Sequence, residues 1–224
     1  MSEPTTEPSS APRKPGRPSR PPLTEAMIAQ AALEIIDEHD WQSCTMKALA
    51  QRLGVRAPSL YHHVAGQHEI VDLVRKLVVS EIHDPAILDL PAAEAMWQFG
   101  IAYYRAFAKH PNTIQLLSTT PIRDRDTLQM YEVFLQALVR GGWDKQRALE
   151  ALLGLEHLAL GFAFEWNAED LMLDPVAAAA HGAPLVAEIT HDRTNQNAIA
   201  ESTFRSLLGR YIAMFEMEAG DQSL

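Results

Sequence analysis

The segment 45–64 (TMKALAQRLGVRAPSLYHHV) combines residue types and spacing that suit the reading of DNA. Its first part, 45–53, has the pattern of a short amphipathic helix, and Gly54 supplies the left-handed residue that ends such a helix. A second short helix is expected to open with Pro58 and to end near Val64. Two short helices joined by a tight turn form a helix-turn-helix, whose second helix can enter the major groove. The pattern therefore predicts DNA binding, and a tight helical hairpin of another kind is the alternative.

The rest of the chain supplies the elements that must position this segment, and its pattern is helical. No run alternates apolar and polar residues for long enough to form a strand, and no Asn-Gly or Asp-Gly pair signals a hairpin. Residues 171–193 are expected to form a loop with one short helical turn. Helical spacing of apolar residues predicts further helices over 24–39, 67–83, 92–109, 125–140, 144–169 and 194–218. The expected fold class is all-α.

Composition restricts the class of protein. The chain has 224 residues, of which 47% are apolar and 21% charged, so it can bury a sizeable core. The longest uncharged apolar run, residues 158–164, is too short to span a bilayer, and residues 1–22 lack the apolar stretch of a secretory signal. Cys44 is the only cysteine, which excludes an internal disulfide and a cysteine-based zinc site. These features predict a cytoplasmic protein with no membrane partner, cofactor or metal.

Charge is distributed unevenly along the chain, whose net charge is −10. Residues 11–80 carry nine basic and seven acidic side chains, whereas residues 81–224 carry ten basic and twenty acidic ones. The acidic C-terminal part repels a polyanion such as DNA. DNA is therefore expected to approach through the first 80 residues.

The N-terminal residues 1–22 contain seven of the 14 prolines and are expected to form a disordered, basic, proline-rich tail. Within this tail, Gly16-Arg17-Pro18 resembles the core of an AT-hook, in which arginine inserts into a narrow minor groove. The match predicts a DNA contact by Arg17. Because Pro15 stands where that motif usually has arginine, a solvated basic linker is the alternative.

Five short motifs together carry a family resemblance. They are ALEII (32–36), TMKALA (45–50), LGV (53–55), PSLYHHV (58–64) and QHEI (67–70). This combination resembles the TetR family of bacterial transcriptional regulators, and the match is close over residues 24–75. The resemblance implies a tail (1–22), an N-terminal three-helix helix-turn-helix DNA-binding domain (23–66), and a larger C-terminal helical ligand-binding and dimerisation domain (67–224) that starts with a connecting helix (67–83).

The resemblance also implies how the N-terminal domain meets DNA. Some side chains would bind the phosphate backbone, and those that open the second short helix would meet base edges. The implied phosphate contacts are Thr45, Lys47, Tyr61, His63 and Gln67. The implied base-edge contacts are Ala57, Pro58 and Ser59, with Arg56 reaching guanine or phosphate. For Tyr61 the alternative is a half-buried aromatic that holds the hairpin together.

In the C-terminal domain the resemblance implies an effector pocket and a dimer interface. The pocket is expected between the helices 92–109, 125–140 and 144–169, with Phe99, Tyr103, Phe107 and Phe164 in its lining. Its predicted ligand-binding residues are Trp97, Tyr104, His157, Phe162 and Glu165. The predicted dimer contacts are Phe204, Leu207, Leu208, Tyr211 and Phe215. A place in the core or in the interface is the alternative for the aromatic residues and for Glu156 and His157.

The predicted function is that of a ligand-responsive, dimeric repressor, which a small, largely apolar or amphipathic molecule releases from a palindromic double-stranded operator. The alternative is a ligand-independent DNA-binding activator or nucleoid-type protein. Tetracycline–magnesium binding is not expected, because Gln115 or Leu116 replaces the histidine that such members use. An enzyme is not expected, because the sequence lacks Gly-x-Ser-x-Gly, His-Glu-x-x-His, Walker and Gly-x-Gly-x-x-Gly motifs.

Overall fold

The computed structural model describes residues 22–165, 172–191 and 196–221, and in this part of the chain every regular element is a helix. The N-terminal helices are α1 (Glu25–Glu38), α2 (Met46–Leu53), α3 (Ala57–Leu60) and α4 (Gln67–Val79). The others are η1 (Pro85–Asp89), α5 (Ala92–Lys109), η2 (Pro111–Thr113), α6 (Ile114–Thr119), α7 (Arg125–Arg140), α8 (Lys145–Glu165), α9 (Pro175–Ala180), α10 (Pro184–Thr190) and α11 (Gln196–Asp221). None of the described helices is long and apolar enough to cross a membrane.

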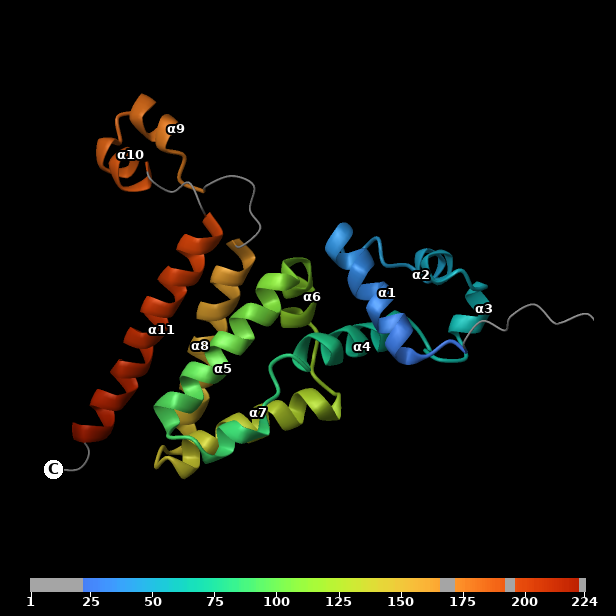
Figure 1. Cartoon of the computed structure of the whole chain (residues 1–224), viewed down its shortest axis with the longest axis horizontal. Helices are drawn as coiled ribbons and strands as arrows, with labels where there is room; N and C mark the ends of the chain where they lie inside the picture. The colour runs from blue at the N-terminus through green and yellow to red at the C-terminus, as the bar shows by residue number, and fades with distance from the viewer. Residues whose placement is uncertain (1–21, 166–171, 192–195, 222–224) are drawn as a thin grey trace, which may run out of the picture.

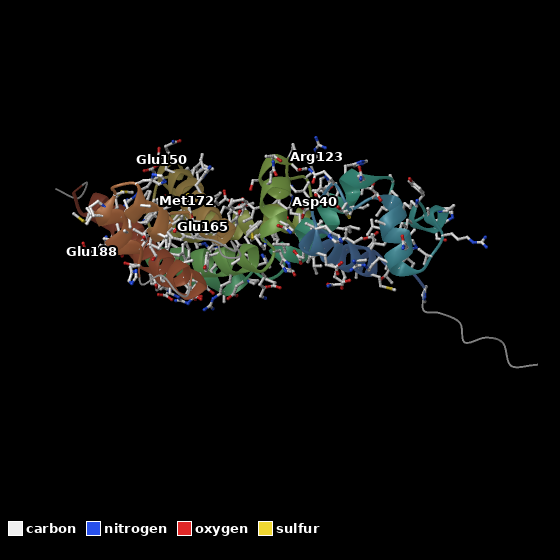
Figure 2. The ribbon with its side chains drawn as sticks, turned by 90° about the horizontal axis from the view of Figure 1, so that it is seen from above. Asp40, Arg123, Glu150, Glu165, Met172 and Glu188 are labelled. Atoms are coloured by element: carbon white, nitrogen blue, oxygen red, sulfur yellow. The ribbon has the colours of Figure 1, made fainter. Side chains whose placement is uncertain are left out.

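The molecule is elongated, with the N-terminal helices at one end (Figure 1). Helix α4 runs from α1–α3 to the body that α5–α8 and α11 form. Seen from above, Asp40 lies towards the N-terminal end, and Glu188 of the α9–α10 pair lies at the other end (Figure 2). Helix α4 therefore connects the N-terminal helices to the body.

The helix-turn-helix forms where the sequence predicted it. The Thr24 side chain caps α1 by accepting from the N–H of Met27, at 3.2 Å. Gly54 ends α2 in the left-handed conformation, with φ of 63°. Leu49 of α2 and Leu60 of α3 are fully buried, so the two short helices share an apolar contact. The predicted bounds of α1 and α2 are confirmed to within one residue, because capping side chains fix them.

Two of the expected N-terminal helices are shorter than predicted. Helix α3 ends at Leu60 instead of Val64, and the chain continues as a turn in which the N–H groups of His63 and Val64 both donate to the carbonyl of Leu60. The turn lets Val64 enter the core, where it is buried. Similarly, α4 ends at Val79, and residues 80–83 form further turns instead of a last helical turn.

A second contact, besides α4, joins the N-terminal helices to the body. The side-chain amide of Asn112 donates to three carbonyls at the end of α1, those of Ile36, Asp37 and His39, at 3.0–3.2 Å. The adjacent His110 Nδ1 lies 2.7 Å from the Asp37 carboxylate. Because the last carbonyls of a helix lack partners within it, Asn112 of η2 acts as a cap for α1.

Helix α5 lies at the centre of the body and packs against α7, α8 and α11. Phe99 stacks on Phe134 of α7, with ring centroids 4.1 Å apart. On another side of α5, Tyr104 stacks on Phe204 of α11 at 4.4 Å. Helix α5 therefore buries apolar side chains on more than one of its sides, as expected for a central helix.

The expectation of a loop over 171–193 is wrong for the described part of that range. Helices α9 and α10 form there and pack against each other. The Asp174 side chain caps α9 by accepting from the N–H groups of Val176 and Ala177, and Pro184 opens α10. The run of alanines within α9 favours a helix once this cap is in place. The short elements η1 and α6 were also not predicted from the sequence.

Candidate functional site

Most of the DNA-binding residues expected from the sequence lie on α2, on α3 and in the turns beside them. The Thr45 side chain caps α2 by accepting from the N–H of Ala48 at 3.1 Å, which leaves its hydroxyl proton free for a phosphate. Lys47 is exposed in the first turn of the same helix. A helix N-terminus and an ammonium group at one place suit an anion.

The predicted base-edge contacts and two of the predicted phosphate contacts lie around α3. Arg56 is exposed directly before α3, and Ala57, Pro58 and Ser59 form its first turn. Tyr61 is 56% exposed, which does not fit the alternative of a half-buried aromatic. His63 is exposed as well, and so is its neighbour His62.

The last two predicted DNA contacts, Gln67 and Arg17, differ from the others. The side-chain amide of Gln67 donates to the carbonyl of Cys44 at 3.3 Å, so this side chain already joins the start of α4 to the residue before Thr45. Arg17 lies outside the described residues.

Cys44, beside this contact, is buried, and burial raises the pKa of its thiol to about 11. A thiol with so high a pKa is almost entirely protonated at neutral pH, and the thiolate is the reactive form. We expect the native protein to resist a thiol-specific reagent at pH 8 and to react once denatured. Counting reacted thiols by mass spectrometry with and without denaturant checks this, and rapid modification of the native chain would contradict it.

A cavity of about 520 Å³ lies where α4, α5, α6, α7 and α8 meet. Its volume is within the range of small-molecule sites. Apolar side chains make up much of the wall: Val79, Phe107, Leu117, Ile122, Leu153 and Leu160. Arg75 and Val79 come from α4, so the helix that carries the N-terminal domain forms part of the wall.

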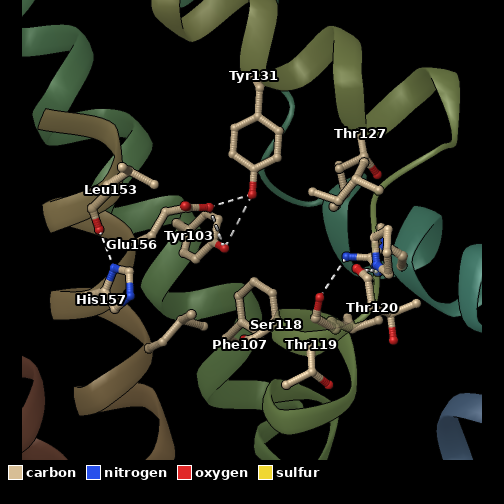
Figure 3. A pocket seen from close by; sticks show the side chains of 16 residues that line it. Tyr103, Phe107, Ser118, Thr119, Thr120, Thr127, Tyr131, Leu153, Glu156 and His157 are labelled. Carbon is tan, nitrogen blue, oxygen red and sulfur yellow. Dashed lines mark hydrogen bonds between the residues drawn. The ribbon is translucent and has the colours of Figure 1, made fainter. Parts of the chain in front are cut away.

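One polar group in the cavity is the carboxylate of Glu156. Tyr103 and Tyr131 both donate their hydroxyls to Glu156 Oε1, the first at 2.9 Å (Figure 3). The two hydroxyls lie 3.5 Å apart. Burial raises the pKa values of both tyrosines well above the usual range, and the negative charge of Glu156, together with Tyr131 in the case of Tyr103, raises them further. Both therefore stay protonated at neutral pH and serve as donors to the carboxylate.

A second polar group is the buried guanidinium of Arg75. Its Nη1 donates to the carbonyl of Leu117 at 2.9 Å, and its Nη2 donates to the carbonyl of Thr120 at 2.8 Å. These carbonyls lie at the end of α6, where helical carbonyls lack partners within the helix. Arg75 thus binds α4 to α6 beside the cavity.

Only one of the five predicted ligand-binding residues, His157, lines this cavity. Trp97 and Tyr104 lie on the side of α5 that faces α11. Successive residues on a helix point about 100° apart, so Tyr104 points away from the cavity that its neighbour Tyr103 lines. Phe162 and Glu165 line a smaller hollow further along α8. Of the other expected lining residues, Tyr103 and Phe107 are in the wall, whereas Phe99 stacks on α7 and Phe164 is exposed. Glu156 and His157, whose place was left open, both lie in the wall.

Three of the five predicted dimer contacts are buried within the single chain. Phe204, Leu208 and Phe215 are core residues of the single chain. Phe215, for example, stacks on Trp143 with ring centroids 5.3 Å apart. The apolar stripe of α11 therefore faces α5 and α8 of its own chain.

The two other predicted dimer contacts, Leu207 and Tyr211, are half-buried. Tyr211 crosses over Gly154 of α8 and donates to the carbonyls of Glu150 and Ala151, each at 3.2 Å. A Cβ at Gly154 would lie 2.1 Å from the Tyr211 hydroxyl, so glycine is required for this close crossing.

Arg75, Thr127 and Tyr131 were not predicted from the sequence. Arg75 had a detectable signal, because it follows Val71 by one helical turn and precedes Val78 by another, and thus stands on the apolar stripe of α4. An arginine at such a position must find buried partners. Thr127 and Tyr131 carried no comparable signal, since single polar residues are common on amphipathic helices.

Comparisons with known proteins agree with this architecture. Residues 28–71 match the family described as bacterial regulatory proteins, tetR family. The class D tetracycline repressor of Escherichia coli is 26% identical over 89% of this chain and 96% of its own length. The transcriptional repressor DrrR1 of Streptomyces coeruleorubidus is 26% identical over 80% of this chain and 73% of its own length.

Solved structures show the same fold. Apo ActR from Streptomyces coelicolor aligns with a TM-score of 0.72 at 22% identity, over 91% of this chain and all of that one (100%). TetR from Acinetobacter baumannii aligns with a TM-score of 0.65 at 21% identity, over 87% of this chain and 97% of that one. Residues 28–71 thus match the DNA-binding part of the tetR family of bacterial regulatory proteins, and over most of its length the chain is similar to proteins named as transcriptional repressors.

Proposed function

We propose that this protein is a homodimeric repressor that binds a near-palindromic operator and that a small molecule in the cavity releases it. The observation that carries the proposal is the double role of α4. This helix packs against α1 at one end and contributes Arg75 and Val79 to the cavity wall at the other. A ligand that favours one position of α4 shifts the position of the whole N-terminal domain. The domain assignment follows: residues 23–66 bind DNA, and residues 67–224 bind the ligand and the second subunit.

Relatives support a response to small molecules. One ActR structure from Streptomyces coelicolor contains actinorhodin, and a TetR variant from Acinetobacter baumannii contains minocycline. In this chain the cavity has apolar walls together with Glu156 and Arg75, so we assign it an amphipathic ligand instead of a largely apolar one. In the alternative of a ligand-independent DNA-binding protein, the cavity has no ligand.

The proposed DNA contacts are those expected from the sequence. Thr45 and Lys47 at the start of α2, and Tyr61 and His63 after α3, bind phosphates on either side of the groove. Arg56 and residues 57–59 meet the base edges. In a dimer the two α3 helices enter successive major grooves, about 34–36 Å apart.

The outer face of α8 and α11 is the proposed dimer interface. Exposed Met214 and half-buried Leu207 share one side of α11 with Tyr211, which bonds to α8, and four such helices from two chains would bury this face. A charge placed there should be expelled from an apolar contact. We expect Met214→Arg to shift the protein towards monomer and to weaken operator binding, whereas Glu216→Arg, almost opposite on α11, leaves the dimer intact. Sedimentation velocity over a concentration series checks both; equal behaviour of the two variants would contradict this interface.

The proposed function is tested first by selecting random DNA duplexes with the purified protein at near-physiological salt. Enrichment of a palindrome with half-sites about one helical turn apart is expected. Salt-sensitive weak binding without an enriched motif would overturn sequence-specific regulation. Compounds that raise the melting temperature of the protein are then added to the operator complex. Release of DNA supports the repressor mechanism, and the absence of any stabilising compound in a broad library favours the ligand-independent alternative.

A further inference from the structure

Arg75 is a buried cation without a buried anion beside it. Its side chain is almost inaccessible, with 3% of the residue surface exposed. Among the described residues, no carboxylate lies within 4.0 Å of its guanidinium, and its two hydrogen bonds go to the neutral carbonyls of Leu117 and Thr120. Buried charges in proteins are normally paired, because an unpaired one is costly. The cavity wall thus holds a guanidinium that no carboxylate of the described residues contacts, since Glu156 in the same wall bonds to the two tyrosines instead.

Hydrogen-bonding capacity at the same place is also unused. Arginine has five N–H donors, of which the α6 carbonyls use two. Arg75 Nε is buried and has no hydrogen-bond partner among the described residues. The Thr127 hydroxyl, from α7, is likewise buried without a partner and lines the same cavity. Two separate elements therefore offer unmet donors to one space.

The opposite part of the cavity has the complementary character. Glu156 receives both tyrosine hydroxyls on Oε1, so its charge remains available to a hydrogen-bond donor. Figure 3 places Glu156 and His157 on one side of the cavity and Thr120 and Thr127 on the other, with Phe107 between them below. A ligand that satisfies both ends must carry an acceptor at one end and a donor at the other, with an apolar body between.

We propose that the effector is a small organic carboxylate whose two charged oxygens bind the Nε edge of Arg75 and the Thr127 hydroxyl, while a hydroxyl or amine at its other end donates to Glu156. An arginine edge binds two oxygens side by side, which favours an anion over a single neutral carbonyl. Because the other N–H groups of Arg75 can stay on the α6 carbonyls, the bound anion would join α4, α6 and α7 at one point. This inference rests on the proposed function only in taking the cavity as the effector site.

The test uses aromatic acids small enough to enter the cavity regardless of the natural effector. The full-length chain is labelled with ¹⁵N-arginine, and the Nε–H signal of Arg75 is identified by its loss in Arg75→Lys. The probes are 4-hydroxybenzoate, benzoate and methyl 4-hydroxybenzoate, the last being the neutral counterpart of the first. We expect 4-hydroxybenzoate to shift the Arg75 signal saturably and to bind at least tenfold more tightly than the ester, which corresponds to about 1.4 kcal/mol. Benzoate, which lacks the donor for Glu156, should bind with intermediate affinity.

Variants separate a direct contact from a general effect of charge. Arg75→Gln should remove the preference for the acid over the ester, whereas Arg140→Gln, an exposed arginine on α7 outside the cavity wall, should keep it. If Arg75→Gln does not fold, Thr127→Val answers the same question, because valine fills the same space and no hydrogen bond of the hydroxyl within the described chain is lost. It should weaken acid binding several-fold and leave ester binding unchanged.

The outcomes are distinct from those of the operator selection. Equal affinity for the acid and the ester, or no saturable shift of Arg75 with either acid up to about 50 mM (a limit that corresponds to only about 2 kcal/mol of binding), would overturn the anion proposal. A palindromic operator found in the selection would still stand in that case. Conversely, acid binding at Arg75 without an enriched operator would leave an anion site in a protein that does not regulate by reading DNA.

Discussion

Replacement of Lys47 by alanine is expected to weaken the binding of every DNA duplex to a similar degree, by about tenfold or more at near-physiological salt. The exposed ammonium stands in the first turn of α2, beside the Thr45 cap, where we propose that it binds phosphate. A phosphate contact carries no sequence information, so specific and nonspecific complexes lose the same free energy. The slope of log affinity against log salt should also become shallower by about one unit. Fluorescence anisotropy with the selected operator and with a scrambled duplex, at several salt concentrations, measures both effects.

Arg52 provides the control, because it is a basic residue on the same helix that faces another way. Its guanidinium binds the carboxylates of Glu34 and Glu38 on α1, so its charge is already matched within the protein. Arg52→Ala should therefore leave the salt slope unchanged. Tyr61→Phe, which removes only a hydroxyl, should have an effect between those of the two alanine variants. Retained affinity in Lys47→Ala, or a loss confined to one sequence, would show that α2 does not hold the phosphate backbone as proposed.

Replacement of Phe204 by alanine is expected to lower the free energy of unfolding by about 3–5 kcal/mol. Its ring is fully buried within one chain, stacked on Tyr104 at 4.4 Å and tilted against Phe162 at 6.0 Å. Alanine would leave a cavity between α5, α8 and α11 that these packed helices cannot close. Urea unfolding at fixed protein concentration measures the change as a lower midpoint with little change in slope.

Leu207, the half-buried neighbour of Phe204 on α11, gives the comparison that separates core from interface. Leu207→Ala should cost less unfolding free energy and should weaken the association of the two subunits, which depends on protein concentration. Phe204→Ala should leave the association constant of the folded protein almost unchanged. A Phe204 variant that stays as stable as the parent but dissociates would mean that the ring belongs to the dimer contact and not to the core.

Local signals were sufficient to predict the helices with defined ends. The predicted ranges 92–109 and 125–140 match the bounds of α5 and α7, because Pro91 precedes one and the capping Asp124 precedes the other. Helices α9 and α10 were missed because each is under two turns long, too short for a periodic pattern to emerge. Their stability depends on Asp174 and on packing against each other, and the second of these is a tertiary contact.

The candidate site was harder to predict, because periodicity gives the spacing of apolar residues and not the neighbour that each one faces. Tyr103 and Tyr104 are equivalent in the sequence, yet one binds Glu156 and the other stacks on Phe204. The choice depends on how α7, α8 and α11 surround α5. For the same reason the apolar stripe of α11 looked like a subunit interface, although much of it serves the chain's own core. By contrast, the exposed positions of Thr45, Lys47 and Tyr61 follow from a compact local motif that needs few distant contacts.

The cap that Asn112 places on the end of α1 has a mechanical consequence. A rigid unit such as α1–α3, joined to the body at one point, can rotate in every direction. A unit held at two separate points can rotate only about the line through them. Helix α4 is one of these points, and the bonds from Asn112 and His110 to the end of α1 are the other. We therefore expect α1–α3 to rotate about the single axis through these two attachment points, so that one angle describes their position. In the proposed symmetric dimer, this one angle sets the separation of the two α3 helices. The same angle therefore sets the spacing of the two DNA half-sites that the protein can bind.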